Sequence, residues 1–296
     1  MIESVPSQIL NTVVMRPYFV LFFLTYLVGC SLHLGLRRAL LFAIVGYLIA
    51  WLSEYSSIHT GIPFGLYHYT ELTKGKELWL LGVPFMDSMS FVFLAYASYT
   101  MALMVTMPVL RYRGIYLLET KKKRWSPGTA ILGALFFMYL DIIIDPVALQ
   151  GHRWFLGRLY YYPEGGVYFG VPISNFAGWF VVGLLLISSL QALDRFLDRG
   201  NSKNWFAGCC PSRYLVGPIL YSGVVVFNLS VAFAIGEYSM AWTGVFLMLL
   251  PGILLRSIVR AGLAQERMEE AVEAHLKDFS AVVMPASWMG KRPTGD

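Results

Sequence analysis

Long apolar segments alternate with short polar segments along almost the whole chain. Seven stretches of 17 or more mainly apolar residues recur, at about 17–35, 39–57, 78–110, 127–149, 170–193, 214–236 and 239–257. A helix of about 20 residues crosses a hydrocarbon core of about 30 Å, whereas unpaired strands cannot satisfy their backbone groups there. The pattern therefore predicts an all-α integral membrane protein with about seven transmembrane helices. The overlong 78–110 stretch is expected to be tilted, or kinked at Pro84.

The composition agrees with this fold class, because 57% of the 296 residues are hydrophobic and only 14% are charged. No small-residue cleavage site follows the first stretch, so we expect a retained helix and not a signal peptide. We divide the chain into a seven-helix membrane domain, 1–257, and a cytoplasmic amphipathic helix and tail, 258–296. In that helix charged positions alternate with apolar ones, which is typical of a helix in solvent or on a bilayer surface.

Basic residues fall in alternate loops and in the tail. One side of the membrane receives 18 of the 23 lysines and arginines, from about 37–38, 111–124, 195–213 and 256–292. The positive-inside rule assigns that side to the cytoplasm, which places the amino terminus outside and the carboxyl terminus inside. We expect the protein to lie in the cytoplasmic (inner) membrane. The net charge of +5 follows from this loop bias, so it gives no indication of nucleic-acid binding.

Two segments of the chain resemble each other. Gly82-Val83-Pro84 and Gly170-Val171-Pro172 each open a span after an aromatic, glycine-rich loop, and each loop follows a span that ends in acid. Glu54 precedes Gly82 by 28 residues, and Asp141 precedes Gly170 by 29. This spacing predicts an internal helix–loop–helix repeat in parallel orientation. The alternative is that Gly and Pro often begin a span after a loop without any common ancestry.

Acidic residues inside the apolar stretches are the main candidates for chemistry, because each costs at least about 2.5–3.5 kcal/mol to bury in a membrane. Counting along the helices puts Asp141 about 21 Å, Asp145 about 27 Å and Glu54 about 24 Å from the cytoplasmic start of each span. Asp87 and Glu237 fall near the same leaflet, so five acids converge on the outer half. Asp145 precedes a proline and can instead cap a new turn, whereas Asp141 has no such role.

Several chemistries are excluded by the residues that they require. The five histidines form no close pairs of the kind that a membrane iron oxygenase needs, and no glycine-rich phosphate turn follows a strand. All eight lysines lie in loops or the tail, so no retinal Schiff base is possible. A prenyltransferase with two aspartate-rich magnesium motifs remains open, because Asp194 and Asp198 repeat the spacing of Asp141 and Asp145. The positive-inside orientation puts the two pairs on opposite sides, and we expect the second pair to form weak surface ion pairs with its neighbouring arginines.

Acid catalysis on an apolar substrate fits the remaining features. A carboxylic acid in a low-dielectric site stays protonated near neutral pH and can donate a proton to a carbon–carbon double bond. Aromatic faces stabilise the resulting cation, and water from the nearby interface can capture it.

Several separated motifs, in the same order, closely resemble the membrane carotenoid-biosynthesis hydratase family. They are Gly61-Ile62-Pro63-Phe64-Gly65-Leu66-Tyr67-His68-Tyr69, Leu81-Gly82-Val83-Pro84, Asp145-Pro146 and the segment from Tyr168 to Trp179. That family contains the carotenoid 1,2-hydratases of bacteria and the bisanhydrobacterioruberin hydratases of haloarchaea. The resemblance implies cofactor-free addition of water to the terminal double bond of an acyclic carotenoid end group, which gives a tertiary alcohol.

With this reaction in view, we expect Asp141 to donate the proton and Asp145 or Glu54 to tune it or to position water. The side chains expected to orient that water or to line the polyene end are His59, His68, Asn175, Tyr67, Tyr69, Trp154, Phe176 and Trp179, with Asp87 and Glu237 at the same site. No metal and no cofactor are expected. The expected partners are the acyclic carotenoid, water and the lipid bilayer, and the protein can also associate with other carotenoid-pathway enzymes. A membrane prenyltransferase and a non-catalytic carotenoid- or lipid-binding protein stay open as alternatives.

Overall fold

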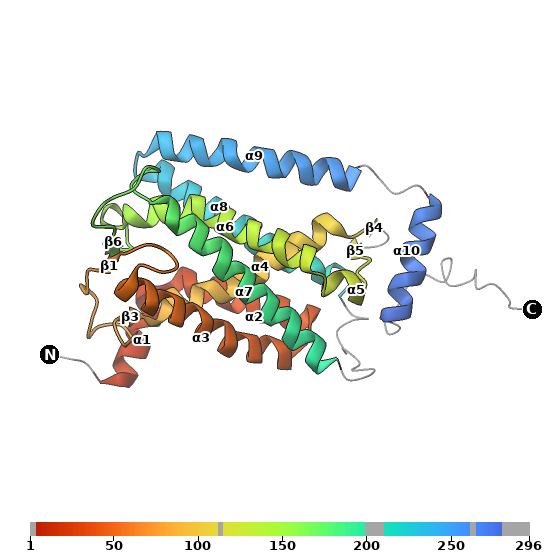
Figure 1. Cartoon of the computed structure of the whole chain (residues 1–296), viewed down its shortest axis with the longest axis horizontal. Helices are drawn as coiled ribbons and strands as arrows, with labels where there is room; N and C mark the ends of the chain where they lie inside the picture. Colours follow the sequence, from red (N-terminus) through yellow and green to blue (C-terminus); the bar gives the residue numbers. More distant parts are fainter. Residues whose placement is uncertain (1–3, 112–114, 199–209, 261–264, 280–296) are drawn as a thin grey trace, which may run out of the picture.

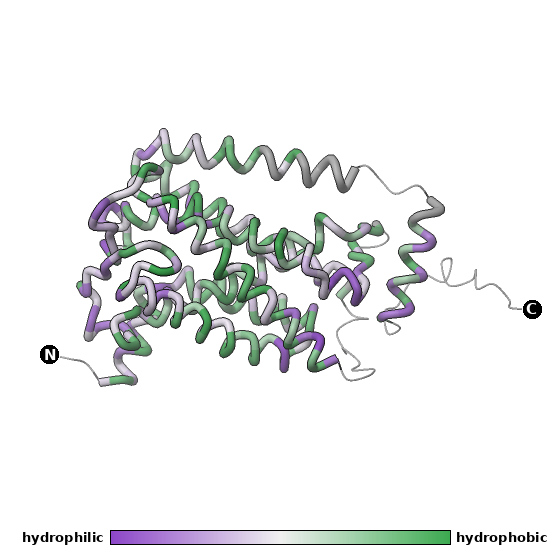
Figure 2. Tube along the Cα trace, in the orientation of Figure 1, coloured by the Kyte–Doolittle hydropathy of each residue, from purple (hydrophilic) through white to green (hydrophobic). Residues whose placement is uncertain are grey.

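The chain folds into a bundle of helices with a few short strand pairs at its two ends (Figure 1). The computed structural model describes residues 4–111, 115–198, 210–260 and 265–279. Each of the seven apolar stretches contains a helix: α2 (Pro17–His33), α3 (Leu36–Thr60), α4 (Phe85–Thr106), α6 (Pro127–Leu149), α7 (Ile173–Leu197), α8 (Val216–Ala234) and α9 (Tyr238–Arg260). Hydropathy colouring shows that the coloured parts of these helices are largely apolar (Figure 2).

Among the described residues, five helices are long and apolar enough to cross a membrane: α3, α4, α6, α7 and the helix that ends at Ala234. A short first helix, α1 (Val5–Met15), meets α2 at a bend of 89°, and the pair would make a sixth span if it counts as one. In α9 the apolar part of the described chain, Tyr238–Leu249, is shorter. A helical membrane protein is therefore supported by length and composition, and a total of seven spans stays a prediction.

The start of α4 differs from the expected kink at Pro84. Two short strands, β2 (Trp79–Leu80) and β3 (Val83–Pro84), pair before the helix, which begins at Phe85. Leu81 and Gly82 connect them with φ angles of 47° and 85°, the left-handed values that a two-residue hairpin turn requires. Pro84 ends this hairpin and stands at the N-cap of α4, so it bends no helix.

A turn of the same kind precedes α7. Tyr168 pairs with Val171 across Phe169 and Gly170, whose φ angles are 49° and 86°. Pro172 then stands at the N-cap of α7, as Pro84 does for α4. The two segments thus share their backbone conformation as well as their sequence, although their common ancestry stays a prediction.

Helix α4 lies at the centre of the bundle and packs against α2, α3, α6, α7 and α8. Its residues from Phe91 to Leu103 are all buried. Small residues allow close approach of its neighbours: a Cβ placed on Gly217 of α8 would lie 2.7 Å from the Cβ of Thr100. This packing holds the helices in a fixed arrangement, and polar side chains gather at one end of it.

At the opposite end, Asp194 corrects the expectation of a surface ion pair with its neighbouring arginine. Its carboxylate is buried, and it lies 2.8 Å from the Nε of both Arg38 and Arg124, whereas the Trp125 indole donates a hydrogen bond of 2.6 Å. These partners come from segments far away in the sequence, which neighbouring charges alone could not indicate. Asp194 therefore joins α3, α5 (Lys121–Arg124) and α7 at this end.

The tail helix also departs from the expected solvated or bilayer-bound position. The apolar face of α10 (Gln265–Asp278), with Val272 at its centre, packs against a hairpin formed by β4 (Val109–Arg111) and β5 (Ile115–Leu117). The His275 imidazole lies 2.7 Å from the Glu119 carbonyl oxygen, and the Lys121 amide donates to the Asp278 carboxylate at 2.8 Å. Although burial would raise the pKa of the Glu119 carboxyl, Arg124 and His33 lower it to about 2. The helix therefore covers a buried, charged end of the bundle.

Candidate functional site

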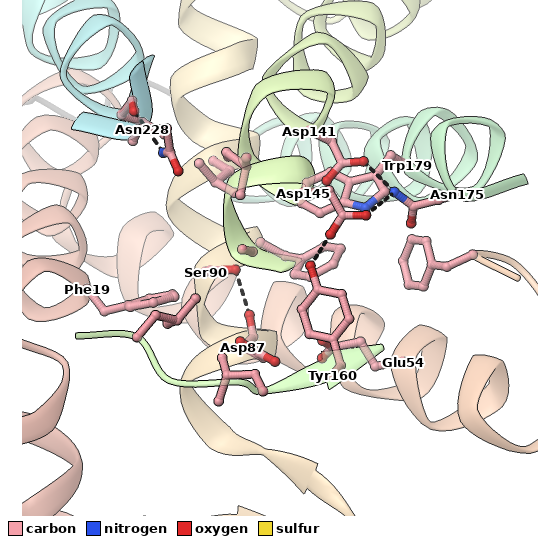
Figure 3. A pocket seen from close by; sticks show the side chains of 18 of the residues that line it. Phe19, Glu54, Asp87, Ser90, Asp141, Asp145, Tyr160, Asn175, Trp179 and Asn228 are labelled. Carbon is pink, nitrogen blue, oxygen red and sulfur yellow. Dashed lines mark hydrogen bonds between the residues drawn. The ribbon is translucent and has the colours of Figure 1, made fainter. Parts of the chain in front are cut away.

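A cavity of about 130 Å³ lies at the end of the bundle that carries the acidic residues (Figure 3). It is surrounded by α2, α3, α4, α6, α7 and α8 and by the loops before α4 and after α6. Nine of the residues expected from the sequence line it: Glu54, Tyr67, Tyr69, Asp87, Asp141, Asp145, Trp154, Asn175 and Trp179. The structure therefore brings together side chains from α3, α4, α6, α7 and two loops.

Four expected residues lie away from this cavity. His59 is exposed and its Nδ1 lies 2.7 Å from the Tyr55 carbonyl oxygen, whereas His68 is exposed beside Tyr161. Five residues of helix rotate a side chain by about 140°, so His59 cannot share the face of Glu54. Phe176 packs on the Tyr168 ring, and Glu237 forms an ion pair with Arg153.

Asp141 and Asp145 lie one turn apart on α6 and face the same side, as their spacing requires. The Asn175 amide donates to both, at 2.6 Å to Asp141 Oδ2 and 2.9 Å to Asp145 Oδ2. Helix α6 continues through Pro146 to Leu149, so Asp145 caps no new turn and that alternative is wrong. Asp141 is fully buried, and its Oδ1 has no hydrogen-bond partner in the part of the chain that the structure describes.

Two tyrosines complete the surroundings of Asp145. Tyr160 donates to Asp145 Oδ1, and Tyr162 donates to Asp145 Oδ2 at 3.0 Å. Burial raises the pKa of the Tyr160 phenol far above its usual range, and the neighbouring Asp145 carboxylate raises it further. The Tyr160 and Tyr162 hydroxyls thus keep their protons and act as hydrogen-bond donors. Asp145 therefore accepts three hydrogen bonds, whereas Asp141 accepts one.

Glu54 forms a second acidic group, on α3. Its Oε1 accepts a hydrogen bond of 3.0 Å from the Tyr69 hydroxyl, and its Oε2 accepts one from Ser88 of α4. Asp87 precedes that serine and also lines the cavity. In the ranges that the structure covers, none of the four cavity carboxylates forms an ion pair with a lysine or arginine.

One tyrosine from each acidic group, Tyr69 and Tyr160, lies in a shared pair of strands. β1 (His68–Tyr69) runs antiparallel to β6 (Tyr160–Tyr161), with His68 opposite Tyr161 and Tyr69 opposite Tyr160. Side chains alternate between the two faces of a strand, so Tyr69 and Tyr160 share the face toward the carboxylates. Tyr67 packs edge-on against both rings, with centroids 5.4 Å and 5.7 Å away.

The opposite wall of the cavity is mainly aromatic and was not expected from the sequence. Figure 3 shows Phe19 of α2 and Asn228 of α8 across the cavity from Asp141 and Asp145. Tyr18, Phe22 and Phe227 line the same wall. The sequence carried a signal for Asn228, which interrupts an apolar stretch as Asp141 does, but none for aromatic residues inside such a stretch.

The arrangement supplies a proton donor, proton acceptors and aromatic faces in one mainly apolar cavity. Asp141 has a free oxygen that can carry a proton, and Asp145 and Glu54 are held by fixed donors. The rings of Tyr67, Tyr160 and Trp179 offer faces that attract a cation. Within the described ranges, no three His, Cys, Asp or Glu side chains are grouped so that they could hold a metal ion.

Comparisons with known proteins point to isoprenoid pigments. Residues 7–251 match the family model described as carotenoid biosynthesis protein. The bisanhydrobacterioruberin hydratase of Haloarcula japonica is 27% identical to this chain over 195 residues. That alignment covers 63% of this chain but only 58% of the relative, so the matched part spans less than two thirds of the relative's length. No solved structure matches the chain.

Proposed function

Because this chain belongs to the carotenoid biosynthesis protein family, we propose that its cavity adds water to the terminal carbon–carbon double bond of an acyclic carotenoid. The product is a tertiary alcohol. One observation carries the proposal: Asp141 is fully buried beside Asp145, with one oxygen lacking a hydrogen-bond partner in the described structure. The name of the related hydratase supports the same reaction class.

The proposed reaction is an acid-catalysed hydration in two steps. Asp141 gives its proton to the less substituted alkene carbon, so the positive charge develops on the tertiary carbon. A water molecule adds its oxygen to that carbon and releases a proton to a carboxylate of the cavity. The Asn175 amide contacts both Asp141 and Asp145, so it holds donor and acceptor in a fixed geometry. Proton return to Asp141 closes the cycle, and no metal or organic cofactor takes part.

Each carboxylate has a distinct role in this proposal. Asp145 accepts three hydrogen bonds, which match the acceptor capacity of a deprotonated carboxylate. Asp141 accepts one, so a proton on its free oxygen displaces no donor. Asp141 is therefore the donor and Asp145 the acceptor. The tyrosine and tryptophan rings stabilise the intermediate cation, each contact being worth about 2 kcal/mol when desolvated.

Expression in a lycopene-producing bacterium tests the proposal, with pigments identified by mass. The wild-type chain should convert pigment to products heavier by one water per reacted end. The Asp141→Asn variant should insert normally and lose conversion by about 10²–10⁴-fold, the usual contribution of a general acid. Glu237→Gln is the matched control, because this acid lies outside the cavity and pairs with Arg153.

Other outcomes of this experiment would point to other functions. Full conversion by the Asp141→Asn variant would refute the proton-donor role. Gain of a five-carbon unit would indicate a prenyltransferase instead. Asp194, which would belong to the second magnesium motif of such an enzyme, forms ion pairs with two arginines in this structure. Bound but unchanged pigment would indicate a carotenoid-binding protein. We further propose that the protein works in the inner membrane, where it can meet other enzymes of the pathway.

A further inference from the structure

The cavity is too small for a whole carotenoid. Its volume is about 130 Å³, and a cavity of about 150 Å³ holds a molecule the size of benzene. A carotenoid is about as long as the bilayer is thick, roughly 30 Å. Only the reacting end group can therefore lie among the carboxylates, and the conjugated chain must leave the cavity through one of its walls.

Most walls are closed by tight helix packing. A Cβ on Gly178 of α7 would lie 2.5 Å from the Pro63 carbonyl oxygen, so the loop after α3 rests directly on α7. Phe91, Phe137 and Trp179 stack between α4, α6 and α7, with centroids 4.6–5.8 Å apart. At these contacts the backbone and the stacked rings pack tightly beside the acidic groups.

The wall between α2 and α8 is different. The two helices touch closely near their far ends, where a Cβ on Gly29 would lie 2.7 Å from Val216 Cγ1. Nearer the cavity, aromatic rings fill the space between them. Tyr18 stacks on Phe227 with centroids 5.2 Å apart and planes at 17°, and Phe22 meets Phe227 edge-on at 5.9 Å. In this part of the wall, side chains and not the helix backbones close the space between α2 and α8.

The outer side of these rings lies at the surface that is expected to face lipid. Leu21 and Leu24 of α2 and Val226 of α8 are 62%, 52% and 62% exposed. Phe155 is 61% exposed, and its ring contacts both Tyr18 and Phe227. Tyr18, Phe22 and Phe227 are only partly buried, although they line the cavity on their other side. The same rings thus border both the cavity and the expected hydrocarbon.

We propose that this aromatic seam, formed by Tyr18, Phe22, Trp154, Phe155 and Phe227, is the lateral entrance and binding groove for the conjugated chain of the polyene. The identity of the ligand rests on the proposed function. Flat rings match a flat conjugated chain, and burial of apolar area between them stabilises the complex. Arg16 holds the outer end of the seam, because its guanidinium binds both Glu77 and the Leu156 carbonyl oxygen.

Pigment binding tests the groove without relying on turnover. Each variant is made in the Asp141→Asn background and purified from lycopene-producing cells, and the bound polyene per protein is measured by visible absorbance. Phe227→Trp adds bulk to the seam and should lower the bound polyene about tenfold, or about 1.4 kcal/mol of binding free energy. Val226→Trp places a tryptophan one residue away, on the exposed face, and should leave binding unchanged.

A photo-crosslinking amino acid at either position gives a second measurement that needs no blocking substitution. Photo-leucine, whose diazirine side chain is smaller than that of phenylalanine, should attach to the polyene at position 227, and at position 226 it should attach to lipid. Equal loss of pigment in both tryptophan variants, or no cross-link at 227, would overturn the entrance. If the chain that keeps Asp141 cross-links polyene at position 227 but releases no hydrated product, the hydratase proposal fails while the groove stands.

Discussion

Three hydrogen-bond donors surround Asp145, whereas among the described residues Asn175 is the single donor to Asp141. Helix periodicity alone makes the two acids equivalent, because it places both on one face of α6. Their difference arises from Tyr160 and Tyr162, which a strand pairing across the chain brings to Asp145. The proposed division into a proton donor and a proton acceptor thus rests on the surroundings of each carboxylate.

Asn175 offers a sharp test of this division. Asn175→Ala removes the amide that joins the two carboxylates, and a hydrogen bond to a charged group is worth about 1.5–3 kcal/mol. We expect hydration to slow by roughly one to two orders of magnitude, measured as hydrated pigment formed per protein in reconstituted vesicles. Ser189→Ala is the control on the same helix, because that hydroxyl bonds only to its own helix at Leu186. An unchanged rate in Asn175→Ala would contradict the shared role of the amide.

Some residues of the candidate site could be predicted from the sequence and others could not. Glu54, Asp141 and Asn175 were predictable because each interrupts an apolar helix, which is costly unless the side chain finds partners. His59 was misleading, since loop proximity said nothing about the face of α3 on which it lies. Tyr18 and Phe227 left no signal, because an aromatic residue in an apolar stretch is expected whether it faces lipid or a cavity.

Helix packing at the element scale depends on small residues at particular contacts. Gly217 and Gly223 both lie in α8, but a Cβ would meet Thr100 at the first and nothing within 4 Å at the second. We expect Gly217→Ala to cost about 1–3 kcal/mol, as overpacking does, because α8 must move away from α4.

Gly223→Ala is the matched control and should be neutral or stabilising by up to about 1 kcal/mol, from helix propensity alone. Thermal unfolding in detergent, followed by tryptophan fluorescence, measures both. Equal midpoints for the two variants would mean that the α4–α8 contact does not limit stability.

The elements themselves were predictable to different degrees. The apolar stretches located the long helices, since length and hydropathy act locally. The break between α1 and α2 falls where Pro17 follows Arg16, and a proline restricts the residue before it. The pairing of β1 with β6 joins residues about 90 positions apart, for which no local pattern exists.

At the scale of the whole molecule, the two ends of the bundle have separate roles. Figure 1 shows β1, β3 and β6 at one end and β4, β5, α5 and α10 at the other. Because α10 packs far from the cavity, Val272→Asp should detach it by placing a charge among apolar side chains.

We expect faster proteolysis of the Val272→Asp variant near 265–279, observed by mass spectrometry, with pigment hydration unchanged. Glu273→Ala, at an exposed neighbouring position, should be cleaved at the wild-type rate. Loss of hydration in Val272→Asp alone would show that α10 influences the distant cavity.

The basic residues predict a direction for the molecule in the membrane. Arg38, Arg124 and α10 share one end of the bundle, and the carboxylate cavity lies at the other. The positive-inside rule then predicts that the cavity opens near the outer leaflet and that the carboxyl terminus is cytoplasmic. This requires α9, whose 23 residues extend about 34 Å, to cross the membrane.

Reporter fusions test that direction. A green fluorescent protein at the carboxyl end should fluoresce, and alkaline phosphatase at the same place should be inactive, because the phosphatase folds only where disulfides form. Phosphatase inserted between Glu164 and Gly165, in the loop before α7, should be active. If both phosphatase fusions are active, α9 does not cross the membrane and the predicted seven-span topology is wrong. If the activities are reversed, the basic end faces outward and the carboxylates work at the cytoplasmic leaflet.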